Sequence, residues 1–182
     1  MLVTSTLESS LKAFFASNLN LGGSPDYSLL ASNFATVIDD YVRTSQDSLG
    51  NPCLLVDKTI LTSSSGLPAL FSSALVNNSA DYFASQFEAL LVSYLLTGTY
   101  ATLIVPVGGI SGSGTLNKVS VAQPDLGKLA LELKNLNYTD IDSKMHNLAV
   151  AISSTILKTK TSISYLIPGS PPSPMVQSLS VT

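Results

Sequence analysis

The stretch Tyr82 to Val107 constrains the fold of this chain more than any other segment. In its first half, apolar residues recur at the i, i+4, i+7 and i+8 spacing of one helix face; they are Phe83, Phe87, Leu90, Leu91, Tyr94 and Leu95. The other face is small and uncharged. Thr97-Gly98-Thr99 ends the predicted helix, and the β-branched run from Tyr100 to Val107 predicts a strand. A second short strand is predicted from Thr115 to Val121.

The same order of short helix, long helix and strand recurs on both sides of this stretch. Upstream, a long helix is predicted over Tyr27 to Thr44 and a strand over Cys53 to Leu61. Downstream, a short helix from Leu126 to Leu136 and a long helix ending near Lys158 precede a strand from Thr161 to Ile167. Unrelated amphipathic helices can also look alike, so the pattern leaves open whether the unit is a true repeat.

We therefore predict an α+β, helix-rich fold built from three pseudo-repeats, residues 1–63, 64–121 and 122–167. One such unit is too small to bury its own apolar faces, so the three are expected to share one core in a single compact domain, 1–167. The proline-rich segment 168–182 predicts an extended C-terminal arm. Its last residues, Met175 to Thr182, are expected to add a strand to a neighbouring subunit.

Charged residues are scarce, and this scarcity limits the functions that the chain can have. They make up 12% of the chain, against about 25% in an average domain. A surface so poor in charge suggests that neighbouring molecules cover much of it. The net charge of −3 provides no basic footprint for nucleic acid. Residues 89–117 carry no charge at all, but Thr97-Gly98-Thr99 and Pro106 interrupt them, which favours a buried helix and strand over a membrane span.

Residues that could support chemistry are isolated from suitable partners. His146 is the only histidine, and Asp142, four residues earlier, is its one nearby carboxylate. Cys53 is the only cysteine, begins a predicted strand and is expected to be a buried structural thiol. Gly109 to Gly114 contains no lysine and lacks the spacing of a phosphate-binding loop. We expect no catalytic, cofactor or metal site, and no enzymatic activity.

The helix and strand pattern resembles that of small virion structural proteins of tailed bacteriophages. The resemblance rests on Leu30 to Val42 with Thr59 to Leu61, on Leu148 to Ile156 and on Thr161 to Pro172. Cys53 to Lys58 departs from it, because this stretch lacks the expected Gly/Thr-rich character. The resemblance implies a subunit of the neck, tail or baseplate, assembled in the host cytoplasm, with other virion proteins as partners in a homo-oligomer or hetero-assembly.

The predicted interface comprises the small helix face, the glycine-rich loop and the C-terminal arm: Ala84, Ser85, Ala89, Ser93, Gly108, Gly109, Gly112, Gly114, Pro168, Pro171, Pro172 and Val176. A face of small side chains allows close approach of another helix, and an extended arm can pair by main-chain hydrogen bonds. The alternative interpretation is a small binding module that uses the uncharged 89–117 segment to take a hydrophobic ligand or to contact a membrane surface.

Overall fold

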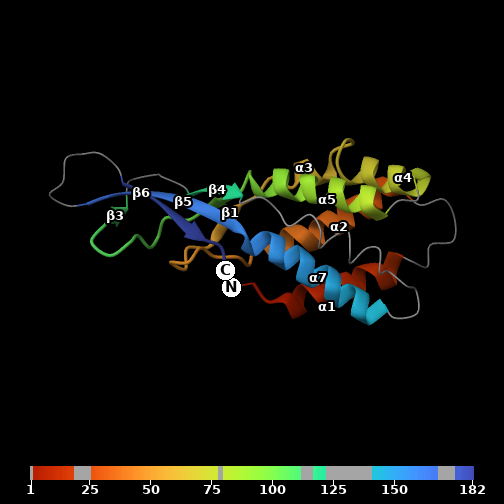
Figure 1. Cartoon of the computed structure of the whole chain (residues 1–182), viewed down its shortest axis with the longest axis horizontal. Helices are drawn as coiled ribbons and strands as arrows, with labels where there is room; N and C mark the ends of the chain where they lie inside the picture. Colours follow the sequence, from red (N-terminus) through yellow and green to blue (C-terminus); the bar gives the residue numbers. More distant parts are fainter. Residues whose placement is uncertain (1, 19–25, 78–79, 112–116, 122–140, 168–174) are drawn as a thin grey trace.

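The computed structural model describes residues 2–18, 26–77, 80–111, 117–121, 141–167 and 175–182. Its helices gather at one end of an elongated molecule and its strands at the other (Figure 1). The fold is therefore α+β and helix-rich, as predicted. The helices are α1 (Thr4–Asn18), α2 (Tyr27–Val42), α3 (Thr59–Thr62), α4 (Leu67–Asn77), α5 (Ala80–Leu95) and α7 (Ile141–Leu157). The strands are β1 (Cys53–Leu55), β2 (Thr99–Tyr100), β3 (Ile110–Ser111), β4 (Asn117–Val121), β5 (Thr159–Leu166) and β6 (Met175–Ser180).

The helices bury their apolar faces in one shared core. α1 packs against α2 and α7, while α4 packs against α2 and α5. Asp26 begins α2 by accepting hydrogen bonds from the amides of Ser28 and Leu29, at 2.9 and 3.1 Å. Phe34 of α2 lies at the centre, with its ring 5.2 Å from that of Phe14 on α1 and 5.6 Å from that of Phe87 on α5. Edge-to-face and tilted contacts of this kind add to the burial energy.

The predicted helix face of α5 is confirmed, whereas the strand expected after it is much shorter. Phe87, Leu91 and Tyr94 are fully buried. β2 stops at Tyr100, and residues 101–109 follow an irregular path. The side chain of Asn51 holds Ile104 through two hydrogen bonds, 2.6 Å to its amide nitrogen and 2.8 Å to its carbonyl oxygen. These main-chain groups are therefore bound by a side chain rather than by a neighbouring strand.

The strand predicted over Cys53 to Leu61 was wrong in its second half. β1 ends at Leu55, and a helical turn, α3, occupies Thr59–Thr62. The cause is Asp57, whose carboxylate accepts hydrogen bonds from both the amide (3.0 Å) and the hydroxyl (2.6 Å) of Thr59. Such a turn, closed by an aspartate side chain, precedes the helical turn and ends the extended conformation.

The strands pair antiparallel in the order β1-β2-β4-β5-β3, and β6 lies on the other side of β5. β6 pairs with β5 residue by residue, from Tyr165 opposite Met175 to Lys160 opposite Ser180. The predicted extended arm was therefore wrong for Met175–Ser180, which is a strand of the chain's own sheet. Leu179 accounts for this, because its side chain is buried in a small cluster with Ile163 and Tyr165. Residues 168–174 lie outside the described part of the chain.

The loop after α2 joins the two borders of the sheet at its base. Gln46 pairs with Pro52 next to β1, and Asp47 pairs with Val181 just beyond β6. The amide of Thr182 donates to the carbonyl oxygen of Gln46 at 2.7 Å, and the amide of Gln46 donates back to the carbonyl of Thr182 at 3.0 Å. The last residue of the sequence is thus fixed beside the start of β1.

The order of elements can be compared with the predicted units only in part. Two helices and a strand follow one another as α1-α2-β1 and again as α4-α5-β2, but α1 is nearly as long as α2, and α3, which was not predicted, lies within the first unit. β4 and β5 form where the strands 115–121 and 161–167 were predicted, within a few residues. The short helix predicted over 126–136 lies outside the described residues. The threefold repeat itself stays a prediction.

Candidate functional site

A polar cluster lies where the helices meet the sheet, and its geometry fits a structural role. The buried carboxylate of Asp39 on α2 accepts a hydrogen bond from the Tyr94 hydroxyl at 2.7 Å and another from the Arg43 Nε at 2.8 Å. Burial and the neighbouring carboxylate raise the pKa of the Tyr94 hydroxyl well above its usual value. The guanidinium of Arg43 also donates to the carbonyl oxygens of Leu54 (3.4 Å) and Val56 (3.5 Å). One ion pair therefore links α2, α5 and β1.

Cys53 is buried beside this cluster, as the sequence predicted. Loss of hydration raises the pKa of its thiol to about 11, and the nearby Arg43 charge offsets only part of this effect. A thiol with such a pKa is almost entirely protonated at neutral pH and is a poor nucleophile.

His146 lies on the surface in an ion-pair cluster that connects α1 and α7. Its Nδ1 is 2.8 Å from Glu8 Oε2, and its side chain is 57% exposed. Lys12 contacts Glu8 at 2.8 Å and Asp142 at 3.1 Å. Hydrogen bonds from Lys12 and His146 lower the pKa of Glu8. Asp142, considered from the sequence as an orienting partner for His146, instead pairs with Lys12.

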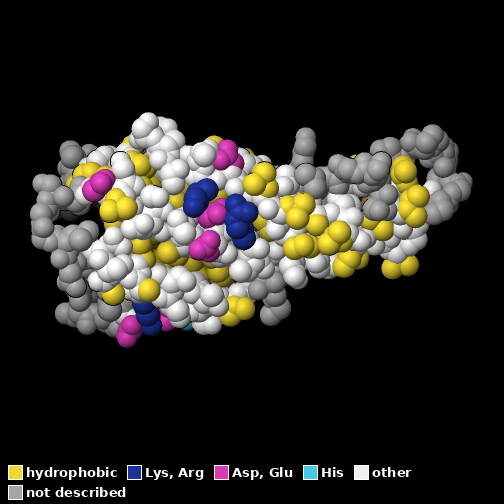
Figure 2. All heavy atoms as spheres, turned by 180° about the vertical axis from the view of Figure 1, so that it is seen from behind, with side chains coloured by type: hydrophobic (Ala, Val, Ile, Leu, Met, Phe, Trp, Pro, Cys, Tyr) yellow, Lys and Arg dark blue, Asp and Glu magenta, His cyan; other side chains and the backbone are white. Residues whose placement is uncertain are grey.

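The feature best suited to function is an exposed apolar surface on the sheet half of the molecule. Figure 2 shows hydrophobic side chains gathered there, while the charged side chains visible on this face lie over the helical half and near the middle of the molecule, where the two halves meet. Among the described residues, the large apolar side chains exposed on this half are Leu54, Leu55, Leu103, Ile104, Val107, Ile110, Ile167, Met175 and Val176. We call this set the apolar sheet surface. Leu103 is 76% exposed and Val176 67%, and Val107 is fully exposed.

Three uncharged sequence segments build this surface. Residues 48–56, 89–117 and 161–182 contain no Asp, Glu, Lys, Arg or His. They supply β1, β2, β3, nearly all of β5 and the whole of β6. The fold brings these segments, which are far apart in the sequence, into one sheet, in which Lys118 of β4 and Lys160 of β5 are the charged residues of the described strands. Exposed apolar areas of this kind mark interaction sites more often than chance.

The irregular loop 101–109 is held in place, so its exposed side chains are presented by a fixed backbone. Asp47 accepts hydrogen bonds from the amide and the side chain of Asn51, both at 2.9 Å, and Asn51 in turn holds Ile104. At Gly109, an added Cβ would lie 2.5 Å from Cδ2 of Tyr165, so the loop approaches β5 more closely than any other residue type permits. Gly108 has a φ of 85°, a conformation that favours glycine.

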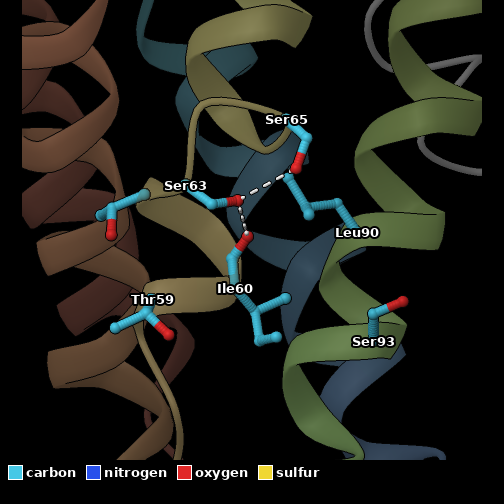
Figure 3. Close-up of a pocket in the computed structure, with 7 residues that line it drawn as sticks. Thr59, Ile60, Ser63, Ser65, Leu90 and Ser93 are labelled. Atoms are coloured by element: carbon cyan, nitrogen blue, oxygen red, sulfur yellow. Dashed lines mark hydrogen bonds between the residues drawn. The ribbon is translucent and has the colours of Figure 1, made fainter.

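A shallow groove runs along the predicted small face of α5. A hollow of about 470 Å³ lies between α5 and the turn joining α3 to α4, with Ile60, Leu90 and Ser93 in its lining (Figure 3). Its remaining lining residues are Thr59, Thr62, Ser63 and Ser65, so the lining carries no charged side chain. The Ser93 hydroxyl donates to the Ala89 carbonyl of its own helix at 2.9 Å. The groove is uncharged and open to solvent.

The predicted interface residues differ in their exposure. The prediction for Ala84 was wrong, because this residue is fully buried in the core of its own chain and cannot contact a partner. Ser85, Ala89, Ser93 and Gly108 are exposed, and Gly109 is half-buried. Val176 belongs to the apolar sheet surface. Gly112, Gly114, Pro168, Pro171 and Pro172 lie outside the described residues.

Sequence reasoning missed Leu54, Leu55, Leu103 and Val107 as surface residues, because it assigned them to buried strands. The available signal was the absence of charge from both 48–56 and 89–117, which are adjacent in the fold. Within the described part of the chain, no group of three or more His, Cys, Asp or Glu residues could hold a metal ion. Nor is any helix there both long and apolar enough to cross a membrane.

Comparisons with protein-family models, with curated proteins and with solved structures find no match to this chain. The geometry described above and the sequence pattern are therefore the basis on which a function is proposed.

Proposed function

We propose that this chain is a structural subunit of a phage particle, in its neck, tail or baseplate, and that it bridges neighbouring virion proteins without catalysis. It would be assembled in the host cytoplasm as a homo-oligomer or with other virion proteins. The observation that carries the proposal is the apolar sheet surface, which includes the side chains of a loop that Asn51 holds in place. A subunit embedded in an assembly has this kind of surface, because its neighbours keep the surface away from water.

The energy available from covering this surface is substantial. Complete burial of one exposed Leu or Val side chain contributes roughly 1.5–3 kcal/mol. Leu55, Leu103 and Val107 are each more than half exposed, so covering them would offset much of the entropy lost on association. The ten residues from Thr102 to Ser111 contain five large aliphatic side chains and no charged one, which suits a protein partner.

The pattern resemblance to small phage virion proteins provides separate support. Two of the segments that carry it, Leu30 to Val42 and Leu148 to Ile156, lie in α2 and α7, which place their apolar faces in the shared core. We also propose that α1-α2-β1 and α4-α5-β2 are two copies of one ancestral unit and that α7-β5 belongs to a third. The three would then share one core, as an assembly subunit of this length requires.

The second candidate function is a module that binds a hydrophobic ligand or a membrane surface. The same exposed side chains, Leu103 and Val107, favour it, since an apolar loop can enter a lipid interface. The loop has no Lys or Arg beside it in sequence to attract anionic headgroups, which makes a protein partner the better fit.

Co-expression with the products of neighbouring genes tests the two functions against each other. The structural proposal predicts a complex that co-purifies, and its loss in the double variant Leu103→Lys, Val107→Lys. Leu29→Lys on α2 is the matched control, because Leu29 is 54% exposed but lies in the helical half. Flotation with neutral and anionic phospholipid vesicles completes the test. Binding to vesicles that Leu103→Lys abolishes, together with no protein complex, would favour the alternative.

A further inference from the structure

The two outer strands of the sheet differ in how their free edges are protected. β1 is three residues long, and its register with β2 shifts between Cys53 and Leu55. Arg43 covers its outer side by donating hydrogen bonds to the carbonyl oxygens of Leu54 and Val56. Short length, irregular register and charged side chains are the means by which proteins prevent a sheet edge from pairing with another molecule.

β6 has none of these protections among the described residues. It spans Met175–Ser180 without a proline or a charged residue, and its register with β5 is unbroken. No charged side chain occurs from Thr161 to the end of the sequence. Within the described part of the chain, β6 pairs with β5 alone. A flat, uncharged edge of this length is open to addition of a further strand.

The hydrogen bonds at the base of the sheet show which main-chain groups face outward. The amide of Val181 donates to the carbonyl of Thr159, which directs it toward β5. Because amides alternate in direction along an antiparallel strand, those of Val176 and Ser178 point away from β5. The amide of Thr182 points the same way and is bound by Gln46. The open edge therefore ends where residues 46–47 begin, and Gln177 lies at its centre.

We propose that two copies of this chain pair through β6, antiparallel across a two-fold axis at Gln177, so that their sheets become one. Val176 of each copy then exchanges both main-chain hydrogen bonds with Ser178 of the other copy. The loop at the base limits how far this register can shift toward Thr182. A shift of the axis to Ser178 would place Met175 of the second copy opposite Val181, a position that Asp47 already occupies.

A second copy is the occupant that the side chains fit. A two-fold axis at Gln177 places the side-chain amide of Gln177 opposite that of Gln177 in the second copy. It also places the apolar side chain of Leu179 opposite that of Met175 in the second copy. Met175 and Val176, 48% and 67% exposed, then lie beside Leu179 and Ser178 of the second copy. Identical strands usually bring like charges together, which is destabilising, but this edge has none. β6 can therefore face a copy of itself without bringing like charges together.

This inference goes beyond the proposed function and does not depend on it. The dimer forms from the purified chain alone through the main chain of β6, whereas the proposed bridging role requires neighbouring virion proteins and is tested at Leu103 and Val107 of the 101–110 loop. A chain that dimerises but binds no virion protein would support the β6 dimer and refute the proposed bridging function.

Cysteine cross-linking tests the register directly. At a non-hydrogen-bonded pair such as Gln177 with its own copy, the Cα atoms lie about 4.5 Å apart, which a disulfide can bridge. Under mild oxidation, Gln177→Cys should form a covalent dimer about tenfold faster than Ser178→Cys, whose copy lies diagonally across the axis. Cys53 does not interfere, because it is buried. A Gln177→Cys chain that stays monomeric, or cross-links no faster than Ser178→Cys, overturns the proposal.

A proline variant tests the hydrogen bonds. Ser178→Pro removes an amide that points away from β5, a place where a strand tolerates proline. We expect wild-type protein to have twice the 19.1 kDa chain mass by light scattering, and Ser178→Pro to have the single-chain mass with an unchanged circular dichroism spectrum. Gln177→Ala, which keeps every main-chain N–H group of β6, should remain dimeric. A dimeric Ser178→Pro, or a monomeric wild type, contradicts the proposal; if Ser178→Pro does not fold, the cross-linking rates decide.

Discussion

The hydroxyl of Tyr94 donates a hydrogen bond to the buried carboxylate of Asp39 at 2.7 Å, across the contact between α5 and α2. The two residues lie 55 positions apart in sequence, yet they complete one cluster with Arg43, which reaches on to β1. The helical and sheet halves of the molecule are therefore joined through a satisfied buried charge. The apolar sheet surface can bear load from a partner only if this junction is rigid.

Removing that hydroxyl should destabilise the fold without changing its shape. Tyr94→Phe leaves one oxygen of the Asp39 carboxylate without its donor in a buried site, which costs roughly 1–3 kcal/mol. Tyr27→Phe, at a half-buried tyrosine on the first residue of α2, is the control and should change stability by less than about 0.5 kcal/mol. Urea unfolding followed by circular dichroism measures both. Equal midpoints for the two variants would show that the Asp39 hydrogen bond contributes nothing.

The buried thiol makes stability depend on alkaline pH. The pKa of Cys53 is raised to about 11 in the folded chain, so the unfolded thiol ionises at lower pH than the folded one. Stability from this group is complete below the unfolded pKa and falls as the pH rises toward 11. The wild type should therefore lose more stability than Cys53→Ala between pH 8 and pH 10, measured by urea midpoints. The same loss in both proteins would contradict burial of the thiol.

The ion-pair cluster between α1 and α7 makes a small contribution to the stability of the fold. This contribution is lost as the pH falls, whereas that of Cys53 is lost as the pH rises. Lys12 and His146 lower the pKa of Glu8, so its contribution is present above the unfolded pKa and is lost as the pH falls through the folded one. Glu8→Gln should therefore flatten the fall in melting temperature between pH 6 and pH 3. A Glu8→Gln profile that matches the wild type at every pH would rule this linkage out.

Replacing either Gly108 or Gly109, in the loop 101–109, should destabilise the fold, but for different reasons. Gly109→Ala places a methyl group against the Tyr165 ring and should cost about 1–3 kcal/mol through overpacking. Gly108→Ala meets no atom within 4 Å, but its φ of 85° costs about 1–2 kcal/mol for a residue with a Cβ. Asparagine tolerates that conformation, so Gly108→Asn should recover part of the loss, whereas Gly109→Asn should not. Denaturation midpoints that rank the four variants differently would contradict the loop geometry.

Sequence periodicity predicted the parts of this fold that depend on local spacing. The buried stripe of α5 and that of α2 follow from the recurrence of Phe87, Leu91 and Tyr94, and of Phe34, Ile38 and Tyr41. The failures come from single polar side chains that act at a distance. Asn51 binds the main chain of Ile104, 53 residues away, and the β-branched run 101–107 is consequently no strand. Asp57 starts α3 in the same way, by a cap that competes with an extended conformation.

The candidate surface was harder to predict than the core. Hydrophobic residues such as Leu103 and Val107 are predicted from sequence to lie in the core, and only the structure shows that they are exposed. Ala84 shows the reverse error, since a small residue on a helix was assigned to an interface and is buried instead. The lack of charge in 89–117 was the available signal, and its meaning became clear only where β1 pairs with β2 and β5 pairs with β3, which places the other two uncharged segments beside it.

The measurement that tests the central claim most directly is the mass of the purified full chain by light scattering after size exclusion. If the apolar sheet surface is an assembly surface, the chain will elute with a defined mass above twice the 19.1 kDa of one copy, because β6 pairing alone yields a dimer, or will be insoluble until a neighbouring gene product is co-expressed. A clean mass of one or two copies at every concentration up to the micromolar range would contradict the claim, because the apolar side chains of the 101–110 loop would then be stable in water without a partner.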